Sequence, residues 1–314
     1  MDSPASAART GGLAVATALA TVYLIWGSTY LGIRFALEGG WPPLLMAGSR
    51  FIVAGAAFYA FLRWRGVPAP TRAQWPNIAA MAVLLLGLGN GMVCIAEQTV
   101  DSGVAAVAVA SSPLWMALFS ALRGEKPTRI EWIGLAIGFA GVIWLNAGGS
   151  LASSKVGLVA LLVATIAWAF GSVWSRGRNL PSPFMTAAAQ MLVGGALMAV
   201  AGWLIGERFE GLPTLKGTLA VAYLASFGSI VAYSAYMWLL HNVRTALAGS
   251  YAYVNPAVAV LLGAWLAHER FSGHELAAMG VILLGVVGIT LAKARKARPE
   301  KSATPAAANA GADA

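Results

Sequence analysis

Residues 42–62 read PPLLMAGSRFIVAGAAFYAFL, an apolar run with one charged residue, Arg50, near its middle. About 20 apolar residues are enough for a helix to cross a bilayer. A guanidinium at the centre of such a helix costs about 2.5–3.5 kcal/mol on insertion scales, so it is kept where it faces protein or a water-filled cavity. The stretch therefore predicts a membrane protein whose helices bundle around a polar interior.

The composition of the whole chain agrees with this prediction. Of 314 residues, 59% are hydrophobic and 11% are charged, whereas a soluble domain carries about 25% charged residues. The formal charge of +9 does not indicate a nucleic-acid partner, because the basic residues sit in short loops and in the tail, where they suit anionic lipid. The single cysteine, Cys94, excludes an intramolecular disulfide and a Cys-based metal site. We expect neither a cofactor nor a metal.

Hydropathy divides the chain into ten predicted spans and two tails. The predicted fold class is all-α, a polytopic membrane protein with ten transmembrane helices. The spans are 13–35, 42–62, 77–96, 103–122, 130–147, 156–175, 183–205, 217–239, 245–266 and 275–292. Residues 1–12 form an N-terminal tail, and 293–314 form a basic C-terminal tail.

Loop charges predict the orientation. With ten spans, both termini share one side, and that side holds 15 of the 21 Lys and Arg residues. The opposite side holds Arg34, Lys155, Arg208, Lys216 and Arg270, and Arg50 lies within a span. Because cytoplasmic loops are enriched in basic residues, both termini are predicted to be cytoplasmic, in a bacterial inner membrane.

The two halves of the chain repeat one another. Gly27-Ser28 recurs as Gly171-Ser172, Pro43 as Pro183, Pro113 as Pro256, Glu125 as Glu269, and Gly141 as Gly285, at separations of 140 to 144 residues. The first half covers residues 13–147 and the second covers 156–292, and each holds five spans. A linker at 148–155 separates the two halves. An odd number of spans starts the second copy from the opposite face, so the repeats are predicted to be inverted, with the substrate site between them near the midplane.

Several short motifs are similar to those of a known family. They are Trp26-Gly27-Ser28, Arg50-Phe51, Ser111-Ser112-Pro113, Gly124-Glu125, Gly138-Phe139-Ala140-Gly141-Val142, Asn255-Pro256, His268-Glu269 and Gly285-Val286. In their order and double occurrence, over about residues 15–292, the chain resembles the EamA-type branch of the drug/metabolite transporter superfamily. The resemblance implies a ten-helix bundle that exports small metabolites, as the YddG-like amino-acid exporters do. It does not name the substrate.

Arg50 is the first candidate for the substrate site. It could pair with a substrate carboxylate or phosphate, or it could be a structural residue that bonds helix carbonyls inside the bundle. Its repeat mate, Gln190, is expected to bond between helices. Pro113 and Pro256 are predicted to kink the fourth and ninth spans, either as hinges for alternating access or as static bends.

Aromatic and polar side chains are expected to complete an amphipathic cavity wall. On the eighth span, Ser226, Ser229 and Tyr233 have the spacing of one helix face. The remaining candidates are Trp26, Ser28, Asn90, Trp115, Trp168, Ser172, Tyr251 and Asn255.

Glu97, at the end of the third span, is a possible gate or proton carrier, although we expect it to lie in solvent at the helix end. The spans hold no acid at mid-membrane, which weakens a proton relay. Facilitated diffusion or exchange therefore remains open beside proton antiport.

The sequence predicts a secondary transporter that exports small amphipathic metabolites, with amino acids the first expectation, by alternating access. Its partners are then a small-molecule substrate and the lipid bilayer; the oligomeric state stays open, and a monomer is sufficient. A multidrug or sugar carrier of the same fold is the nearest alternative. An intramembrane enzyme or lipid-handling protein would need a catalytic dyad or a lipid-facing groove, and the sequence shows neither. An aqueous channel is the third alternative.

Overall fold

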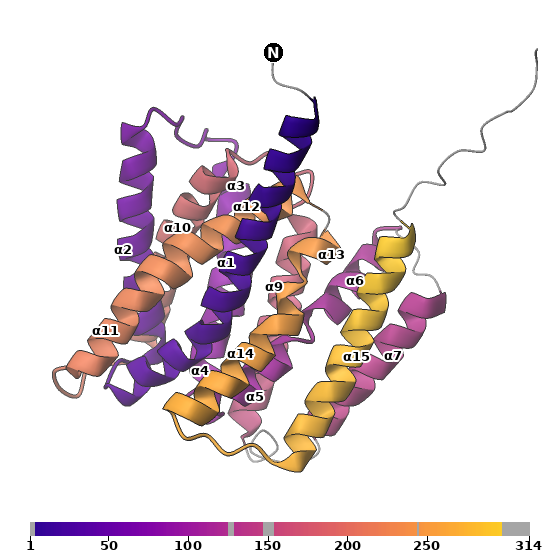
Figure 1. Ribbon diagram of the computed structural model, residues 1–314. Coiled ribbons are helices and arrows are strands. Elements are labelled where there is room, and N and C mark those ends of the chain that lie inside the picture. Colours follow the sequence, from indigo (N-terminus) through magenta and orange to yellow (C-terminus); the bar gives the residue numbers. More distant parts are fainter. Residues whose placement is uncertain (1–3, 125–128, 147–153, 244, 297–314) are drawn as a thin grey trace, which may run out of the picture.

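The computed structural model describes residues 4–124, 129–146, 154–243 and 245–296, and within these ranges every regular element is helical (Figure 1). Glu125 and most of the predicted linker lie outside them. Among the described residues, seven helical runs are long and apolar enough to cross a membrane: Gly12–Glu38, Pro43–Trp64, Trp75–Ala96, Ser102–Leu122, Lys155–Trp174, Pro183–Leu204 and Leu215–Asn242. Shorter apolar helices at Trp132–Gly141, Val254–Leu266 and Gly273–Gly285 lie where the other three spans are predicted. The all-helical membrane fold is confirmed, and the count of ten crossings stays a prediction.

The helices at the two ends of the chain extend beyond their predicted spans. Helix α1 covers Pro4–Glu38, so most of the predicted N-terminal tail is helical. Helix α15 covers Gly273–Lys296 and includes the start of the predicted C-terminal tail. The other unbroken helices are α2 (Pro43–Trp64), α7 (Arg129–Asn146), α9 (Lys155–Trp174) and α10 (Pro183–Leu204).

The third and eighth spans each contain a π-helical middle segment. The third runs through α3 (Trp75–Met81), η1 (Ala82–Gly91) and α4 (Met92–Ala96). The eighth runs through α11 (Leu215–Tyr223), η2 (Leu224–Tyr233) and α12 (Ser234–Asn242). A π-helix bonds residue i to i+5, which shifts the faces of the helix, and such segments are frequent at functional sites. Hydropathy does not distinguish them from ordinary helix, so the sequence did not predict them.

The fourth and ninth spans are broken, but their prolines lie in different settings. The fourth is divided into α5 (Ser102–Val109) and α6 (Ser112–Leu122), and Pro113 lies in the first turn of α6, where the missing N–H would be unpaired anyway. The ninth is divided into α13 (Thr245–Ala248) and α14 (Tyr251–Leu266), and Pro256 lies inside α14. Pro113 thus follows a break between two helices, whereas Pro256 sits inside a continuous helix, and the roles of both as hinges or static bends stay a prediction.

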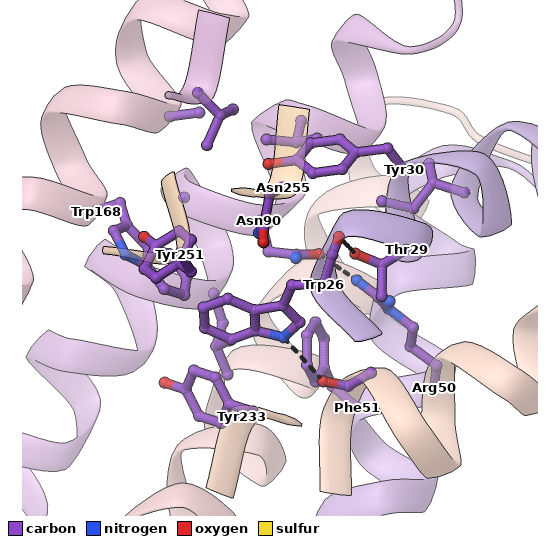
Figure 2. A pocket seen from close by; sticks show the side chains of 17 residues that line it. Trp26, Thr29, Tyr30, Arg50, Phe51, Asn90, Trp168, Tyr233, Tyr251 and Asn255 are labelled. Carbon is purple, nitrogen blue, oxygen red and sulfur yellow. Dashed lines mark hydrogen bonds between the residues drawn. The ribbon is translucent and has the colours of Figure 1, made fainter. Parts of the chain in front are cut away.

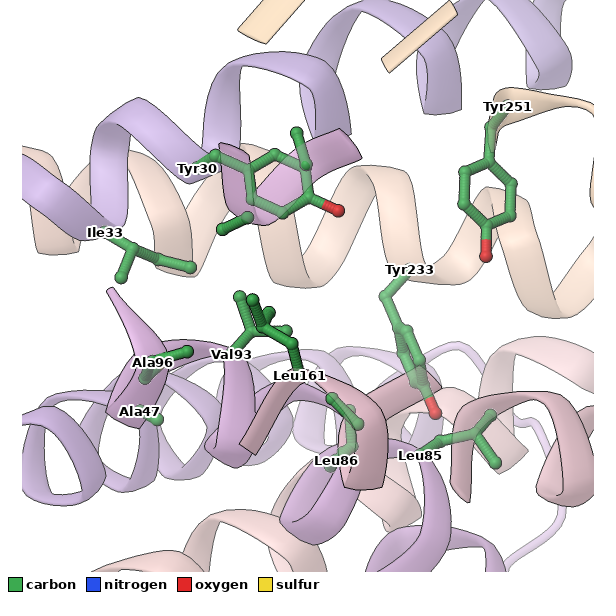
Figure 3. Packing of buried hydrophobic residues seen from close by; sticks show 14 of the residues in the cluster. Tyr30, Ile33, Ala47, Leu85, Leu86, Val93, Ala96, Leu161, Tyr233 and Tyr251 are labelled. Carbon is green, nitrogen blue, oxygen red and sulfur yellow. The ribbon is translucent and has the colours of Figure 1, made fainter. Parts of the chain in front are cut away.

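The most extensive helix contacts join the first half of the chain to the second. Helix α2 packs along α10, and α7 packs along α15 at one edge of the bundle (Figure 1). Helix α1 packs on α14 and η2, and its counterpart α9 packs on α6 and η1. Glycine permits the closest crossing, since a Cβ on Gly285 of α15 would collide with the backbone of α7 at Gly138. The buried core lies where these helices converge, around Leu85, Leu86 and Tyr233 (Figure 3).

Large apolar side chains cover the outside. Leu24, Val53, Trp64, Leu261 and Trp265 are all exposed in the isolated chain. An apolar outer surface of this extent suits lipid as the surrounding solvent.

Candidate functional site

A small cavity lies at the centre of the bundle, between residues of both halves (Figure 2). Its volume is about 70 Å³. Seven of the predicted site residues line it: Trp26, Arg50, Asn90, Trp168, Tyr233, Tyr251 and Asn255. A ligand pocket typically has about 300–1,000 Å³, so this conformation is nearly closed, and cargo needs the helices to move apart.

Arg50 supplies the positive charge of the cavity. Its side chain is 3% exposed, although it lies on the cavity wall. One terminal nitrogen donates to Asn90 Oδ1, and the guanidinium carbon lies 4.5 Å from the centre of the Phe51 ring. Nε is buried, and no described residue accepts a hydrogen bond from it. Because a guanidinium carries five N–H donors, Arg50 has spare capacity for a ligand after it has bonded Asn90.

The second half holds an analogous polar pair. Tyr233 donates its hydroxyl to Gln190 Oε1, and Gln190 Nε2 donates to Met81 Sδ at 3.2 Å. The two bonds are therefore alike. In the first half, Arg50 of α2 bonds Asn90 of η1, and in the second half, Gln190 of α10 bonds Tyr233 of η2. Gln190 is fully buried behind the cavity wall, in keeping with the expected interhelical bond.

Aromatic rings form one side of the cavity. The Trp26 ring centroid lies 5.4 Å from that of Trp168, 5.2 Å from that of Tyr251 and 4.9 Å from that of Tyr236. Trp26 Nε1 donates to Gly228 O at 3.2 Å, and Trp168 Nε1 donates to Tyr236 Oη at 3.2 Å. These bonds fix the indoles, so their ring faces are preorganised.

Six predicted residues do not line this cavity: Ser28, Trp115, Ser172, Gln190, Ser226 and Ser229. Ser28 and Ser172 bond the hydroxyls of Tyr223 and Tyr236. Trp115 packs edge-on against Phe139 at 4.8 Å.

The π geometry of η2 explains where its two serines lie. Ser226 is exposed and bonds Ala222 O, whereas Ser229 is buried and bonds Leu224 O, five residues earlier. The single face predicted for Ser226, Ser229 and Tyr233 assumed 3.6 residues per turn, and the wider turns of η2 remove Ser226 from it.

The remaining wall residues were not singled out from the sequence. On α1, Thr29, Tyr30 and Ile33 follow Trp26 at helical spacing, so the face of Trp26 could have identified them. The others carry no polar signal: Phe51, Leu86, Gly89, Val93, Val109, Ala164 and Gly228.

Arg34, Glu38, Asp101 and Glu269 form an ion-pair cluster at one end of the bundle, which we call the Arg34 end. Arg34 Nη1 lies 2.6 Å from Glu269 Oε1 and 2.9 Å from Asp101 Oδ1, and Nε lies 2.8 Å from Glu38 Oε1. The cluster joins α1, the start of α5 and the connection between α14 and α15. Burial, and then the charge of Glu269, raises the pKa of Asp101 above its ordinary value.

Glu269 is the buried centre of this cluster. Its carboxylate also accepts from Ser102 N and Gly103 N, both at 3.1 Å, and from Ser102 Oγ at 2.5 Å. Two of the first backbone donors of α5 are thereby satisfied. The chain reaches this position through a left-handed residue, His268, at φ +55°.

Glu97 lies at the same end and is buried, which corrects the expected solvated helix end. It is 7% exposed, and neither carboxylate oxygen has a hydrogen-bond partner within the described part of the chain. It borders a hollow of about 870 Å³ that also contains Arg34 and Asp101. Burial, together with the charge of Glu269, raises the pKa of Glu97 well above its usual range, while Arg50 and Arg34 oppose the shift.

Within the described ranges, no group of three or more His, Cys, Asp or Glu side chains is placed to hold a metal ion.

Two segments of the chain, residues 13–147 and 155–291, match the EamA-like transporter family. The chain belongs to this family. It is 50% identical over 277 residues to a protein named "Uncharacterized inner membrane transporter YedA" from Escherichia coli K12, covering 88% of this chain and 90% of that protein. The transporter YvbV of Bacillus subtilis is 26% identical, with 89% and 92% covered. The chain is also similar to a crystal structure at TM-score 0.67 and 25% identity, covering 89% of this chain and 96% of the other.

The resemblance drawn from the short motifs is therefore confirmed. The chain is a membrane transporter of the EamA family, and these relatives are named as transporters rather than enzymes. Their names specify no substrate.

Proposed function

We propose that this chain is a secondary transporter that exports small amphipathic metabolites, amino acids foremost, across the bacterial inner membrane by alternating access. The central cavity is the observation that carries the proposal. It offers one guanidinium, the amides of Asn90 and Asn255, and the aromatic wall around Trp26. Among the described residues that line it, none is acidic.

This set of groups suits a zwitterion. A carboxylate would bond the free donors of Arg50 in a charge-assisted contact. An ammonium group would find the π faces of Trp26 and Tyr251 and the hydroxyl of Tyr233. A bare polycation would meet the guanidinium without an acidic partner. We therefore favour amino acids over lipophilic cations as the cargo.

A flux assay tests the proposed cargo. Purified protein in liposomes is given a panel of radiolabelled amino acids, with lipophilic cations and sugars as competitors. We expect saturable amino-acid flux that shows counterflow and resists both competitors. Inhibition by lipophilic cations or sugars alone would favour the multidrug or sugar carrier, and flux that never saturates would indicate a channel.

The proposed mechanism rests on two inverted five-helix units, 13–147 and 156–292. Three features support it. Segments η1 and η2 begin 142 residues apart, at Ala82 and Leu224. The Arg50–Asn90 bond in one half has a counterpart between Gln190 and Tyr233 in the other. Helix α1 of the first half packs on α14 and η2 of the second half, and α9 of the second half packs on α6 and η1 of the first half. Rocking of one unit against the other would expose the cavity to each side in turn.

The proposed orientation places the Arg34 end in the periplasm and both termini in the cytoplasm. In a Cys94→Ala background, Leu212→Cys should react with an impermeant maleimide added to intact cells. Ala69→Cys should react only after permeabilisation. Both positions are exposed, so the side of the membrane on which each one lies decides whether the reagent reaches it. The reverse labelling pattern would overturn the orientation.

We propose Pro113 and Pro256 as hinges of the fourth and ninth spans. Asn255 precedes Pro256, and its amide orientation is the one in which the nitrogen faces two carbonyl acceptors. In this orientation the amide nitrogen donates to Tyr23 O and Tyr251 O, both at 3.1 Å, and so links α14 to α1. If both prolines permit rocking, Pro113→Ala and Pro256→Ala should slow turnover more than they weaken equilibrium binding. Because Pro113 already follows a break, we expect the larger loss at Pro256. Unchanged flux in both variants would leave two static bends.

A further inference from the structure

Glu97 lies between residues of the central cavity and the hollow at the Arg34 end. It is the C-cap residue of α4, and it lines that hollow. On the same span, Val93 of α4 lies four residues before Glu97 and Asn90 of η1 lies seven residues before it, and both line the cavity. A buried carboxylate thus borders the hollow and lies one turn from a residue that lines the cavity.

Among the residues that the structure describes, none donates a hydrogen bond to the Glu97 carboxylate. Arg34 already bonds three acids, and Arg50 bonds Asn90. Glu269 is saturated by Arg34, Ser102 and Gly103. The titratable and charged groups around Glu97 are Tyr30 and Arg34 of α1, Arg50 of α2, Cys94 of α4, Asp101 before α5 and Glu269 after α14. Glu38, Glu207, Arg208 and Glu210 line the same hollow.

A buried carboxylate in this position is stable only without its charge. An ionised group that lacks donors loses its hydration with nothing to replace it, so it neutralises or the site opens to water. The closed arrangement therefore requires the acid form of Glu97. The charged form requires water, and the adjoining hollow is where water would enter.

We propose that Glu97 is a proton-binding site that couples proton entry to closure of the Arg34 end, so that protons are the coupling ion for export. A proton from the hollow adds to the open, charged carboxylate, and the neutral acid is then buried as this end closes. When the opposite end opens, the proton leaves through the cavity, and the carboxylate regains its charge. The inference rests on the proposed export function and supplies its driving ion.

The raised pKa of Glu97 sets the sign of the pH effect. Because burial raises the pKa, the closed form binds the proton more tightly than the open form does. The preference of protonated Glu97 for the closed form is therefore complete at pH values below the ordinary glutamate pKa, about 4.3, and declines above it. That preference is lost as the pH rises through the raised value.

The native Cys94 is a reporter for this equilibrium. Its side chain is fully buried in the closed form, one turn from Glu97. Maleimide labelling of full-length protein in detergent is measured from pH 5 to 9 and divided, at each pH, by the rate for the same protein unfolded in SDS. Because the buried thiol is shielded and reacts only after this end opens, the ratio removes the titration of the exposed thiol and leaves the opening equilibrium. We expect it to rise about tenfold or more, since one pH unit changes the ratio of charged to neutral carboxylate tenfold.

Glu97→Gln mimics the neutral acid, so its ratio should stay low at every pH. Glu210→Gln is the matched control, because it removes an exposed acid from the same hollow, and it should behave as the wild type does. A flat wild-type ratio, or a pH response that survives in Glu97→Gln, would overturn the proposal. If Glu97→Gln does not fold, Glu97→Asp must shift the midpoint, and an unshifted midpoint would equally overturn it.

A second arm measures coupling in liposomes with an amino acid that passes the flux assay. An imposed pH gradient should drive its accumulation by the wild type, whereas Glu97→Gln should exchange it without responding to the gradient. Gradient-driven accumulation by Glu97→Gln would overturn the coupling. If no amino acid is carried, the cargo proposal fails, and the Cys94 measurement, which needs no substrate, still decides the role of Glu97.

Discussion

Arg50→Ala should lose about 10- to 150-fold in apparent affinity for carboxylate-bearing cargo, while the purified protein keeps nearly its full thermal stability. A hydrogen bond to a charged group contributes about 1.5–3 kcal/mol, and 1.4 kcal/mol is a factor of ten. Stability should change little because Arg50 has one hydrogen-bonded partner, Asn90, and a buried Nε that has none. Substrate-concentration series in liposomes and thermal unfolding in detergent measure the two effects.

Arg50→Lys should restore little of the affinity, because an ammonium is a point charge and cannot present two parallel donors. Arg123→Ala is the matched control, since Arg123 donates to Val173 O at 2.6 Å and does not line the cavity. It should leave affinity unchanged. If Arg50→Ala instead lowers the melting temperature and leaves affinity intact, Arg50 is a structural residue, the alternative that the sequence left open.

The membrane fold and part of the site could be predicted because hydropathy and isolated polar residues are local signals. Arg50 and Asn90 stand out in apolar spans, and the structure brings them into contact. Thr29, Tyr30 and Ile33 needed one further step, the helical periodicity that starts at Trp26.

The features that escaped prediction depend on contacts distant in sequence or on small changes of helix register. Segments η1 and η2 have the same apolar composition as α-helix, so the exposed position of Ser226 could not be foreseen. Glu97 was expected in solvent because it ends a span, yet the structure buries it beside groups from α1, α2 and the α14–α15 connection. Span boundaries alone do not show which loops fold over a helix end.

Glu269→Ala should destabilise the protein far more than Glu38→Ala does, although both acids pair with Arg34. The Glu269 side chain is 0% exposed and satisfies Ser102 N and Gly103 N, whereas the Glu38 side chain is 50% exposed. Each buried donor left unpaired costs about 1–3 kcal/mol, so two donors predict a loss of about 2–6 kcal/mol. A surface ion pair such as Arg34–Glu38 contributes at most about 1 kcal/mol and is screened by salt.

Reversible unfolding in mixed detergent and SDS would measure both losses, and added salt should reduce only the smaller one, because buried pairs are screened less. The same variants connect the cluster to transport. Glu269 holds α1, the start of α5 and the α14–α15 connection together beside Glu97, so its loss should also raise Cys94 labelling at acidic pH, where the wild type is closed. Equal stability of Glu269→Ala and Glu38→Ala, with Cys94 still protected, would mean that helix packing alone keeps the Arg34 end shut. The cluster would then be a consequence of closure and not its cause.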